Sequence, residues 1–319
     1  MENIEVCDIC GSSLIGDGVK IAGLESINII QCGKCGLVIT SPRPDQDEMG
    51  DYYPSDYYAH NVADKTRVQL FKDKLRIYKG KYPTTDGLIS RIYWKLLSKV
   101  FSDFFLFDLP YSGEGKKLLD IGCGTGDTLL WAKESGWDVY GVELNKNAVK
   151  HAHSRGLQNV RCGAIESIVY EDEYFDAIVM TQALEHVSSP RRILNKCHKM
   201  LKRDGYLMVT VPNFNSYPRR IFGDLWHALD IPKHLFHFNE STLEQLTKDC
   251  GFEVEVFRYQ SSIIAVILNV YSFFRVIILK SPYNDLPVYE NFRKSLLNMV
   301  NSEKGLRVSD IMMIRLRKK

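Results

Sequence analysis

The sequence has almost no net charge and does not begin like a secreted protein. Lys and Arg total 41 against 39 Asp and Glu, which leaves a formal net charge of +2. Binding to nucleic acid phosphates usually needs a clearly basic face, so nucleic acid is not an expected partner. The start, Met1–Glu5, is acidic and is not followed by a long apolar core. We therefore expect no signal peptide and a cytoplasmic location.

The chain also lacks a clean membrane span, internal repeats and low-complexity tracts. Residues 263–279 are mostly apolar, but this stretch is only 17 residues long and contains Asn269, Ser272 and Arg275. A span needs about 20 apolar residues. We interpret the stretch as a core or lid helix, with peripheral contact at the inner face of the membrane as the alternative.

Charge is distributed unevenly despite the balanced total. Residues 1–60 hold three Lys/Arg and ten Asp/Glu, whereas residues 61–100 hold ten Lys/Arg and three Asp. The simpler interpretation is two solvated surfaces of opposite sign. The alternative is that the basic stretch 61–100 binds an anion such as a diphosphate or a lipid headgroup.

Four of the eight cysteines occur in two close pairs near the N-terminus. Cys7 and Cys10 form the first pair, and Cys32 and Cys35 form the second after 21 intervening residues. In a reducing compartment such pairs indicate metal ligands rather than disulfides. Four thiolates complete a tetrahedral site, so we predict a structural zinc ion and no catalytic one. The other four are predicted to be buried small hydrophobic residues: Cys123, Cys162, Cys197 and Cys250.

The later part of the chain alternates short apolar runs with helical patterns, which predicts an α/β fold. We expect a Rossmann-like, seven-stranded, mostly parallel sheet, preceded by a small zinc-ribbon-like module and a helical lid. The predicted domains are 1–45 for the module, 46–112 for the lid and linker, and 113–319 for the core with a hydrophobic insertion at about 261–308. Expected strands are 117–121, 138–143, one near 160, 175–180, 206–211, 252–257 and 310–316. Expected helices are 126–135, 146–155, 190–201 and 241–250, the last capped by Asn239 or Ser241.

A glycine-rich turn follows the first core strand. Gly122, Gly124 and Gly126 alternate in a G-x-G-x-G pattern, whereas dinucleotide sites use G-x-G-x-x-G. The spacing therefore disfavours a nicotinamide-dependent oxidoreductase, which stays an alternative. Asp120 before the turn suits a ligand amine, and Glu143 after the second strand suits ribose hydroxyls.

This turn, the order of elements and the segment 175–180 resemble class I S-adenosylmethionine-dependent methyltransferases. The resemblance implies S-adenosyl-L-methionine as cofactor. It also implies cofactor contacts at Asp120, Gly122, Gly124, Glu143, Ala164, Ile165, Thr181 and Gln182.

Two pairs of candidate catalytic residues follow strands at the edge where such sheets bind ligands. Glu185 and His186 come after the fourth strand, and His234 and His237 come after the fifth. A histidine at this edge could take a proton from a hydroxyl, with Glu185 orienting it. The alternative is that these side chains only stabilise their loops.

The order of a four-cysteine module, a Pro-Arg-Pro stretch, a tyrosine-rich segment and this core resembles bacterial methyltransferases of surface-polysaccharide biosynthesis. That resemblance includes the run around His234, with Lys233 where arginine is usual. It implies methyl transfer to a hydroxyl of a sugar or of a nucleotide- or lipid-linked glycan. Separately, Tyr52, Tyr53, Tyr57 and Tyr58 are expected to form either a lid over the cofactor or a hydrophobic seam between module and core.

Other interpretations stay open at this point. A quinone-type or other small-molecule O-methyltransferase is the nearest alternative. The run from Gln182 to His186 also resembles the Glu-x-x-Glu-His motif of metal-assisted methyltransferases, although glutamine is a poor ligand for hard cations. A different class is a binding protein whose zinc module recruits RNA or a partner, but the module has few basic side chains. The sequence does not fix the oligomeric state or choose O- from C- or N-methylation.

Overall fold

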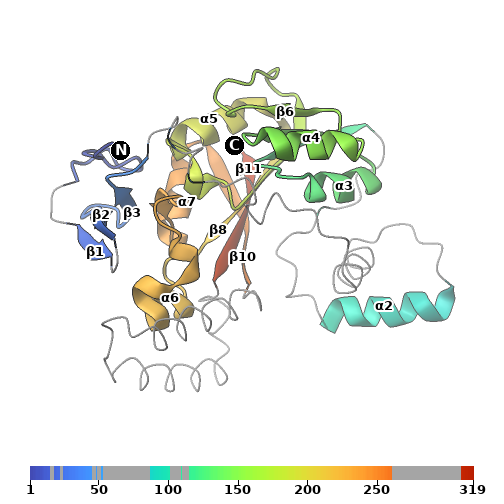
Figure 1. Cartoon of the computed structure of the whole chain (residues 1–319). Helices are drawn as coiled ribbons and strands as arrows, with labels where there is room; N and C mark the ends of the chain where they lie inside the picture. The colour runs from blue at the N-terminus through green and yellow to red at the C-terminus, as the bar shows by residue number, and fades with distance from the viewer. Residues whose placement is uncertain are drawn as a thin grey trace.

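The computed structural model describes residues 1–14, 18–21, 24–44, 48, 52, 87–100, 109, 115–260 and 310–319. These residues form one large sheet and one small sheet (Figure 1). The large sheet has seven strands in the order β10-β11-β8-β7-β4-β5-β6. Its strands are β4 Lys116–Ile121, β5 Trp137–Glu143, β6 Val160–Cys162, β7 Phe175–Thr181, β8 Leu201–Pro212, β10 Phe252–Gln260 and β11 Ile311–Lys318.

Strand directions agree with the predicted mostly parallel sheet. β4, β5, β6, β7 and β8 pair in parallel, while β11 lies antiparallel to both β8 and β10. All seven predicted strands and the four predicted core helices are present. The helices are α3 Asp127–Glu134, α4 Lys146–Ser154, α5 Pro190–Met200 and α7 Glu240–Asp249.

Alternating residues of the buried strands face opposite sides of the sheet. Leu119 and its same-facing neighbours pack against Ile193 of α5 and Leu243 of α7. Leu118 packs instead in a second cluster with Leu129 of α3 and Val149 of α4. Two helical layers therefore enclose the sheet, with α3 and α4 on one side and α5 and α7 on the other (Figure 1).

The cap of α7 was predicted with two candidates, and the structure selects one. The Asn239 side chain accepts a hydrogen bond from the Thr242 amide, and the Thr242 hydroxyl bonds the Asn239 amide in return. This reciprocal cap satisfies two backbone donors that the helix cannot satisfy itself. It also fixes the point at which the chain leaves the site and enters the helix.

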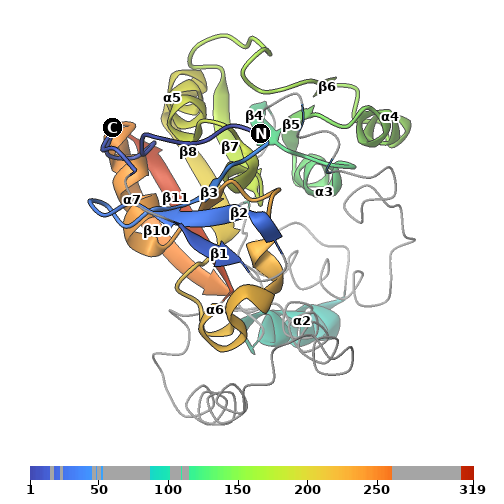
Figure 2. The same ribbon diagram turned by 60° about the vertical axis from the view of Figure 1, so that its left-hand side comes forward.

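The small sheet is antiparallel and has the order β1-β2-β3-β9. β1 Val19–Ile21, β2 Leu24–Gln31 and β3 Val38–Ser41 come from the cysteine module (residues 1–45), whereas β9 Phe236–His237 comes from the core. In Figure 2 the blue strands of the module lie in front of the large sheet. The module is thus joined to the core by a shared sheet.

Several predictions fall on parts of the chain outside the described residues. These are Tyr53, Tyr57, Tyr58, the apolar stretch 263–279 and the insertion 261–308. Within the predicted lid, the structure describes α2 Leu88–Val100. Over the described ranges, no helix is both long and apolar enough to cross a membrane.

The burial predicted for the four unpaired cysteines holds at three positions. Cys123, Cys197 and Cys250 are buried, but Cys162 is exposed, so the prediction was wrong there. Cys162 ends β6, the edge strand of the sheet, where Arg161 and Cys162 are exposed and only Val160 is buried.

Candidate functional site

The glycine turn leads from β4 into α3 at the carboxyl edge of the sheet. Gly122 has a φ of 76°, and a Cβ there would lie 2.9 Å from the Cβ of Ala183. A side chain is therefore excluded on steric as well as conformational grounds. The same close approach brings the turn into contact with the segment that carries Glu185 and His186.

Two carboxylates flank this turn. Glu143 accepts hydrogen bonds from the amides of Gly124 at 2.9 Å and Asn145 at 2.8 Å, so its carboxylate is held against the turn. Asp120 is 2% exposed, and its Oδ1 has no hydrogen-bond partner. Burial and then the charge of Glu143 raise the pKa of Asp120 to about 7. A cationic amine placed there would satisfy the orphaned oxygen and favour its ionised form.

The other predicted cofactor contacts lie along the same edge. The Gly163 amide donates to the Glu143 carbonyl at 2.9 Å, which brings Ala164 and Ile165 beside the end of β5. Thr181 ends β7, and Gln182 follows with a left-handed φ of 51°. A non-glycine residue in this region is strained, and such strain is typical of functional turns. The eight predicted contacts therefore lie at, or directly after, the ends of four neighbouring strands.

Glu185, His186 and His234 form a compact cluster beside this edge. One potential ligand atom from each lies within 4.8 Å of the other two, and the two imidazole rings meet edge to face at 4.6 Å. His186 Nδ1 lies 2.9 Å from the Lys233 carbonyl, and His234 Nδ1 lies 2.8 Å from the Ala228 carbonyl. A carbonyl can only accept, so each neutral ring carries its proton on Nδ1 and keeps Nε2 basic.

Burial shifts the protonation of this cluster toward the neutral forms. Glu185 is fully buried, neither carboxylate oxygen has a hydrogen-bond partner, and burial raises its pKa to about 8. Burial also lowers the pKa of His186 and of His234. The cluster therefore presents basic imidazole nitrogens at neutral pH beside a carboxyl group that tends to hold its proton. His186 is half-buried and is the more accessible of the two histidines.

His237 is separate from the cluster. It lies in β9 under the cysteine module and is 4% exposed. Its Nε2 lies 3.0 Å from the Thr40 hydroxyl, and burial lowers its pKa to about 3. The structure thus brings three of the four predicted catalytic residues together and leaves His237 in a packed position.

The four paired cysteines of the module converge as their spacing predicts. Cys7 Sγ lies 3.5 Å from Cys35 Sγ, and Cys10 Sγ lies 3.5 Å from Cys32 Sγ. The Gly11 amide bonds the Cys7 carbonyl, and the Gly36 amide bonds the Cys32 carbonyl, so each pair turns tightly around its sulfurs. This donor set and geometry fit a tetrahedral zinc ion.

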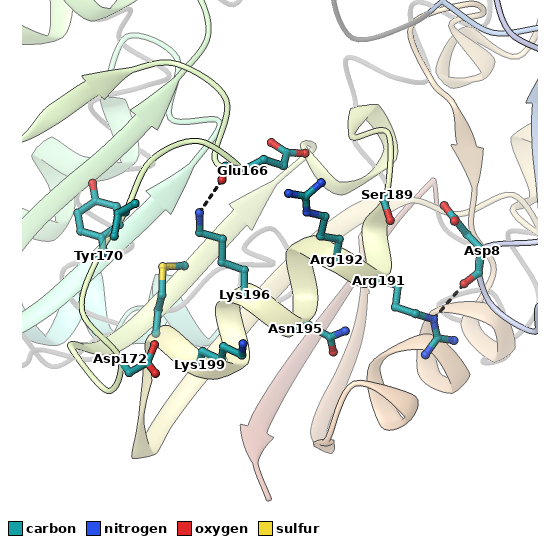
Figure 3. A pocket seen from close by; sticks show the side chains of 12 residues that line it. Asp8, Glu166, Tyr170, Asp172, Ser189, Arg191, Arg192, Asn195, Lys196 and Lys199 are labelled. Carbon is teal, nitrogen blue, oxygen red and sulfur yellow. Dashed lines mark hydrogen bonds between the residues drawn. The ribbon is translucent and has the colours of Figure 1, made fainter.

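A cavity of about 560 Å³ lies elsewhere, along α5 (Figure 3). Two of its basic side chains, Arg191 and Lys196, bind backbone carbonyls of the protein itself. Arg191 Nε donates to the Asp8 carbonyl at 3.1 Å, and Lys196 Nζ donates to the Ile165 carbonyl at 2.6 Å. None of the described residues that line it belongs to the predicted cofactor or catalytic set. The cavity is therefore separate from the predicted site.

Comparison with known proteins gives a family for this architecture. A family model described as "Methyltransferase domain" matches residues 93–256, just over half of the chain. Two curated relatives are named "Ubiquinone biosynthesis O-methyltransferase". The one from Chromobacterium violaceum is 32% identical over 108 residues, covering 32% of this chain and 47% of the relative. The one from Actinobacillus pleuropneumoniae is 33% identical over 138 residues, covering 40% of this chain and 59% of the relative.

The chain thus spans about half the length of the curated relatives it matches. Among solved structures, it resembles an S-adenosylmethionine-dependent methyltransferase from Mesorhizobium loti. The TM-score is 0.46 at 17% identity, over 73% of this chain and 100% of the other.

Proposed function

Because the chain belongs to the methyltransferase-domain family, we propose that it transfers a methyl group from S-adenosylmethionine to a hydroxyl of a sugar. The sugar would be free or part of a nucleotide- or lipid-linked glycan. The observation that carries the proposal is the contact between the glycine turn and the Glu185–His186 segment at Gly122 and Ala183. This contact places the glycine turn, which would bind the cofactor, beside His186, the candidate base.

The described residues fit S-adenosylmethionine. Asp120 would bind the amine of the cofactor through its unpaired Oδ1, and Glu143 would bind the ribose hydroxyls with its remaining lone pairs. Ala164 and Ile165 would flank the adenine, while Thr181 and Gln182 would border the methionine part. When bound, the cofactor supplies an electrophilic methyl group on a sulfonium.

His186 is the base that this geometry favours. Its Nε2 would take the proton of the acceptor hydroxyl while the hydroxyl oxygen bonds the methyl carbon and the carbon–sulfur bond breaks. A positioned base contributes roughly 10²–10⁴-fold in rate, and orienting the two reactants contributes about 7–11 kcal/mol. His234 and Glu185 would hold the ring of His186 in its place. His237 would act only through the segment in which it is packed.

The alternative role of the Glu185, His186 and His234 cluster is to bind a divalent cation. The imidazoles of His186 and His234 and the carboxylate of Glu185, which has no hydrogen-bond partner, direct lone pairs toward the same small space. Binding of either a proton or a metal ion there would reduce the repulsion between these lone pairs. The raised pKa of Glu185 favours the proton when no metal is bound. For the cysteine cluster we propose a structural zinc ion.

A phenol-like hydroxyl is the main alternative to a sugar hydroxyl as the methyl acceptor. The curated relatives are named for ubiquinone biosynthesis, which favours a phenol-like hydroxyl, but the matched region spans only 32–40% of this chain. The sugar proposal depends on the resemblance of the module, the Pro-Arg-Pro stretch and the histidine run. The G-x-G-x-G turn and the family match both weigh against a nicotinamide oxidoreductase. Cytoplasmic location and peripheral membrane contact stay predictions of the sequence.

The test is transfer of labelled methyl from S-adenosylmethionine into a fractionated extract of the source cell. Label in the nucleotide-sugar or glycan fraction supports the proposal, provided that heat-treated protein gives none. Label confined to the quinone fraction would replace the acceptor class and keep the reaction. No label in any fraction would contradict the reaction itself.

A further inference from the structure

The cysteine module and the histidine segment share one sheet. β3 pairs with β9 in antiparallel register, with Val38 opposite His237 and Ile39 opposite Phe236. The Thr40 amide continues the contact by donating to the Leu235 carbonyl at 3.0 Å. The module therefore supplies the neighbour that holds this part of the core in an extended conformation.

Thr40 makes the most specific contact across this boundary. It is fully buried, and its Oγ1 lies 2.7 Å from the His234 carbonyl and 3.0 Å from His237 Nε2. A hydroxyl has one proton, and a carbonyl can only accept, so Thr40 donates to His234 and accepts from His237. His237 is thereby fixed as the Nε2-protonated tautomer, and Thr40 bridges the two histidine positions.

The contact continues from β9 to the candidate base. The Leu235 amide donates to the Glu185 carbonyl at 2.8 Å, and His186 Nδ1 bonds the Lys233 carbonyl. The residues 233–235 are therefore held by Thr40 on one side and by Glu185 and His186 on the other. A shift of this segment would move both imidazoles of the cluster.

Apolar packing supports the same boundary. Ile29 of β2 and Val38 of β3 pack in one cluster with Phe222, Trp226 and Leu229. Phe222 ends the short helix α6 Tyr217–Phe222, and Leu229 ends the 3-10 turn His227–Leu229, both between β8 and the segment that carries His234. The module thus contributes core residues to the region that would surround the acceptor.

We propose that the cysteine module is a built-in part of the acceptor site and that Thr40 is its positioning residue. Thr40 does not touch the reacting atoms; it sets the place of His234 and, through residues 233–235, that of His186. A metal ion at the four cysteines would stabilise β2 and β3 and so maintain the contact. The inference deepens the proposed function and depends on it for its catalytic readout.

The first experiment compares Thr40→Val with Thr40→Ser. Valine keeps the shape but removes both hydrogen bonds, whereas serine keeps the hydroxyl. We expect kcat to fall about 10- to 100-fold in Thr40→Val, with KM for S-adenosylmethionine within about twofold, and serine to restore most of the rate. The matched control is Thr247→Val, a fully buried threonine whose hydroxyl bonds the Glu244 carbonyl within α7.

The comparison separates positioning from general stability. Thr247→Val, which loses one hydrogen bond rather than two, should also lower the melting temperature but leave kcat within about twofold. If kcat falls equally in both variants, or if serine fails to restore it, the positioning role is wrong.

A second experiment needs no methyl transfer. Nitrogen NMR of the histidine side chains should show His237 as the Nε2-protonated tautomer in the native protein and lose that signature in Thr40→Val. Hydrogen exchange should rise in the 235–238 segment when Cys10→Ser disables the cysteine cluster. Faster exchange in the module alone, with 235–238 still protected, would overturn the proposal. These readouts stand even if the proposed reaction is wrong, so the two failures are distinguishable.

Discussion

The proposed cofactor side and the proposed acceptor side of the site are built in different ways. On the cofactor side, Glu143 binds the amides of Gly124 and Asn145, which lie 19 and 2 residues away in the chain. On the acceptor side, Thr40 reaches His234 and His237 across 194 and 197 residues. The first part is made within the consecutive β4–α3–β5–α4 segment of the chain. The second exists only after the module has docked.

This difference suggests that substitutions on one side of the site affect that side alone. The proposed cofactor side depends on carboxylates and backbone groups at the ends of parallel strands of the large sheet. The acceptor side depends on loops between β8 and α7 and on packing from another part of the chain. Changes on one side should therefore leave the other working, and the predictions that follow test this separation in order of expected effect.

The largest effect is expected for His186→Ala. Removal of the proposed base should lower kcat roughly 10²–10⁴-fold while the dissociation constant of S-adenosylmethionine stays within about twofold. Single-turnover kinetics and calorimetry measure the two quantities. The matched control is His151→Ala on α4, which should leave both unchanged. Loss of transfer after dialysis against a chelator, with the cysteine cluster still loaded, would instead favour the divalent cation as occupant.

A smaller effect on the other side is expected for Glu143→Gln. Loss of the charged partner of the Gly124 amide and of the ribose hydroxyls should weaken S-adenosylmethionine binding about 10- to 100-fold. The rate of the bound complex should change much less. Glu134→Gln at the exposed end of α3 serves as the control. If His186→Ala weakened S-adenosylmethionine binding as much as Glu143→Gln does, the separation of the site into two independent sides would be wrong.

The smallest predicted effect is a pH dependence of cofactor binding. The pKa of Asp120 is raised to about 7, so its carboxylate, the form that attracts an amine, becomes more populated as pH rises through 7. Affinity for S-adenosylmethionine should therefore increase up to about tenfold between pH 6 and pH 8. Asp120→Asn should bind more weakly and show little of this slope. An affinity that falls over the same interval in the native protein would contradict the role of Asp120.

The sequence predicts the strands, helices and glycine turn around the proposed cofactor site well because their signals are local. Alternation of strand and helix, the glycine turn and the position of Glu143 all lie within one continuous region, and the structure has every predicted core strand there. The cysteine spacing likewise predicts the convergence of Cys7, Cys10, Cys32 and Cys35.

The acceptor side could be predicted only in part. The chain pattern marks His186, His234 and His237 as polar residues after strands, but it gives no indication that Thr40 would lie between two of them. Pairing between β3 and β9 depends on tertiary packing, and a two-residue strand such as Phe236–His237 has too few residues to produce a periodic signal. His237 therefore looked equivalent to His186 in the sequence, although the structure encloses it beneath the module.

The most direct test of the account is calorimetric titration of S-adenosylmethionine into the native protein, Glu143→Gln and His186→Ala. We predict one-to-one binding to the native protein, unchanged binding to His186→Ala and clearly weaker binding to Glu143→Gln. No binding to the native protein, or binding of NAD in its place, would contradict the cofactor assignment on which the proposed function depends.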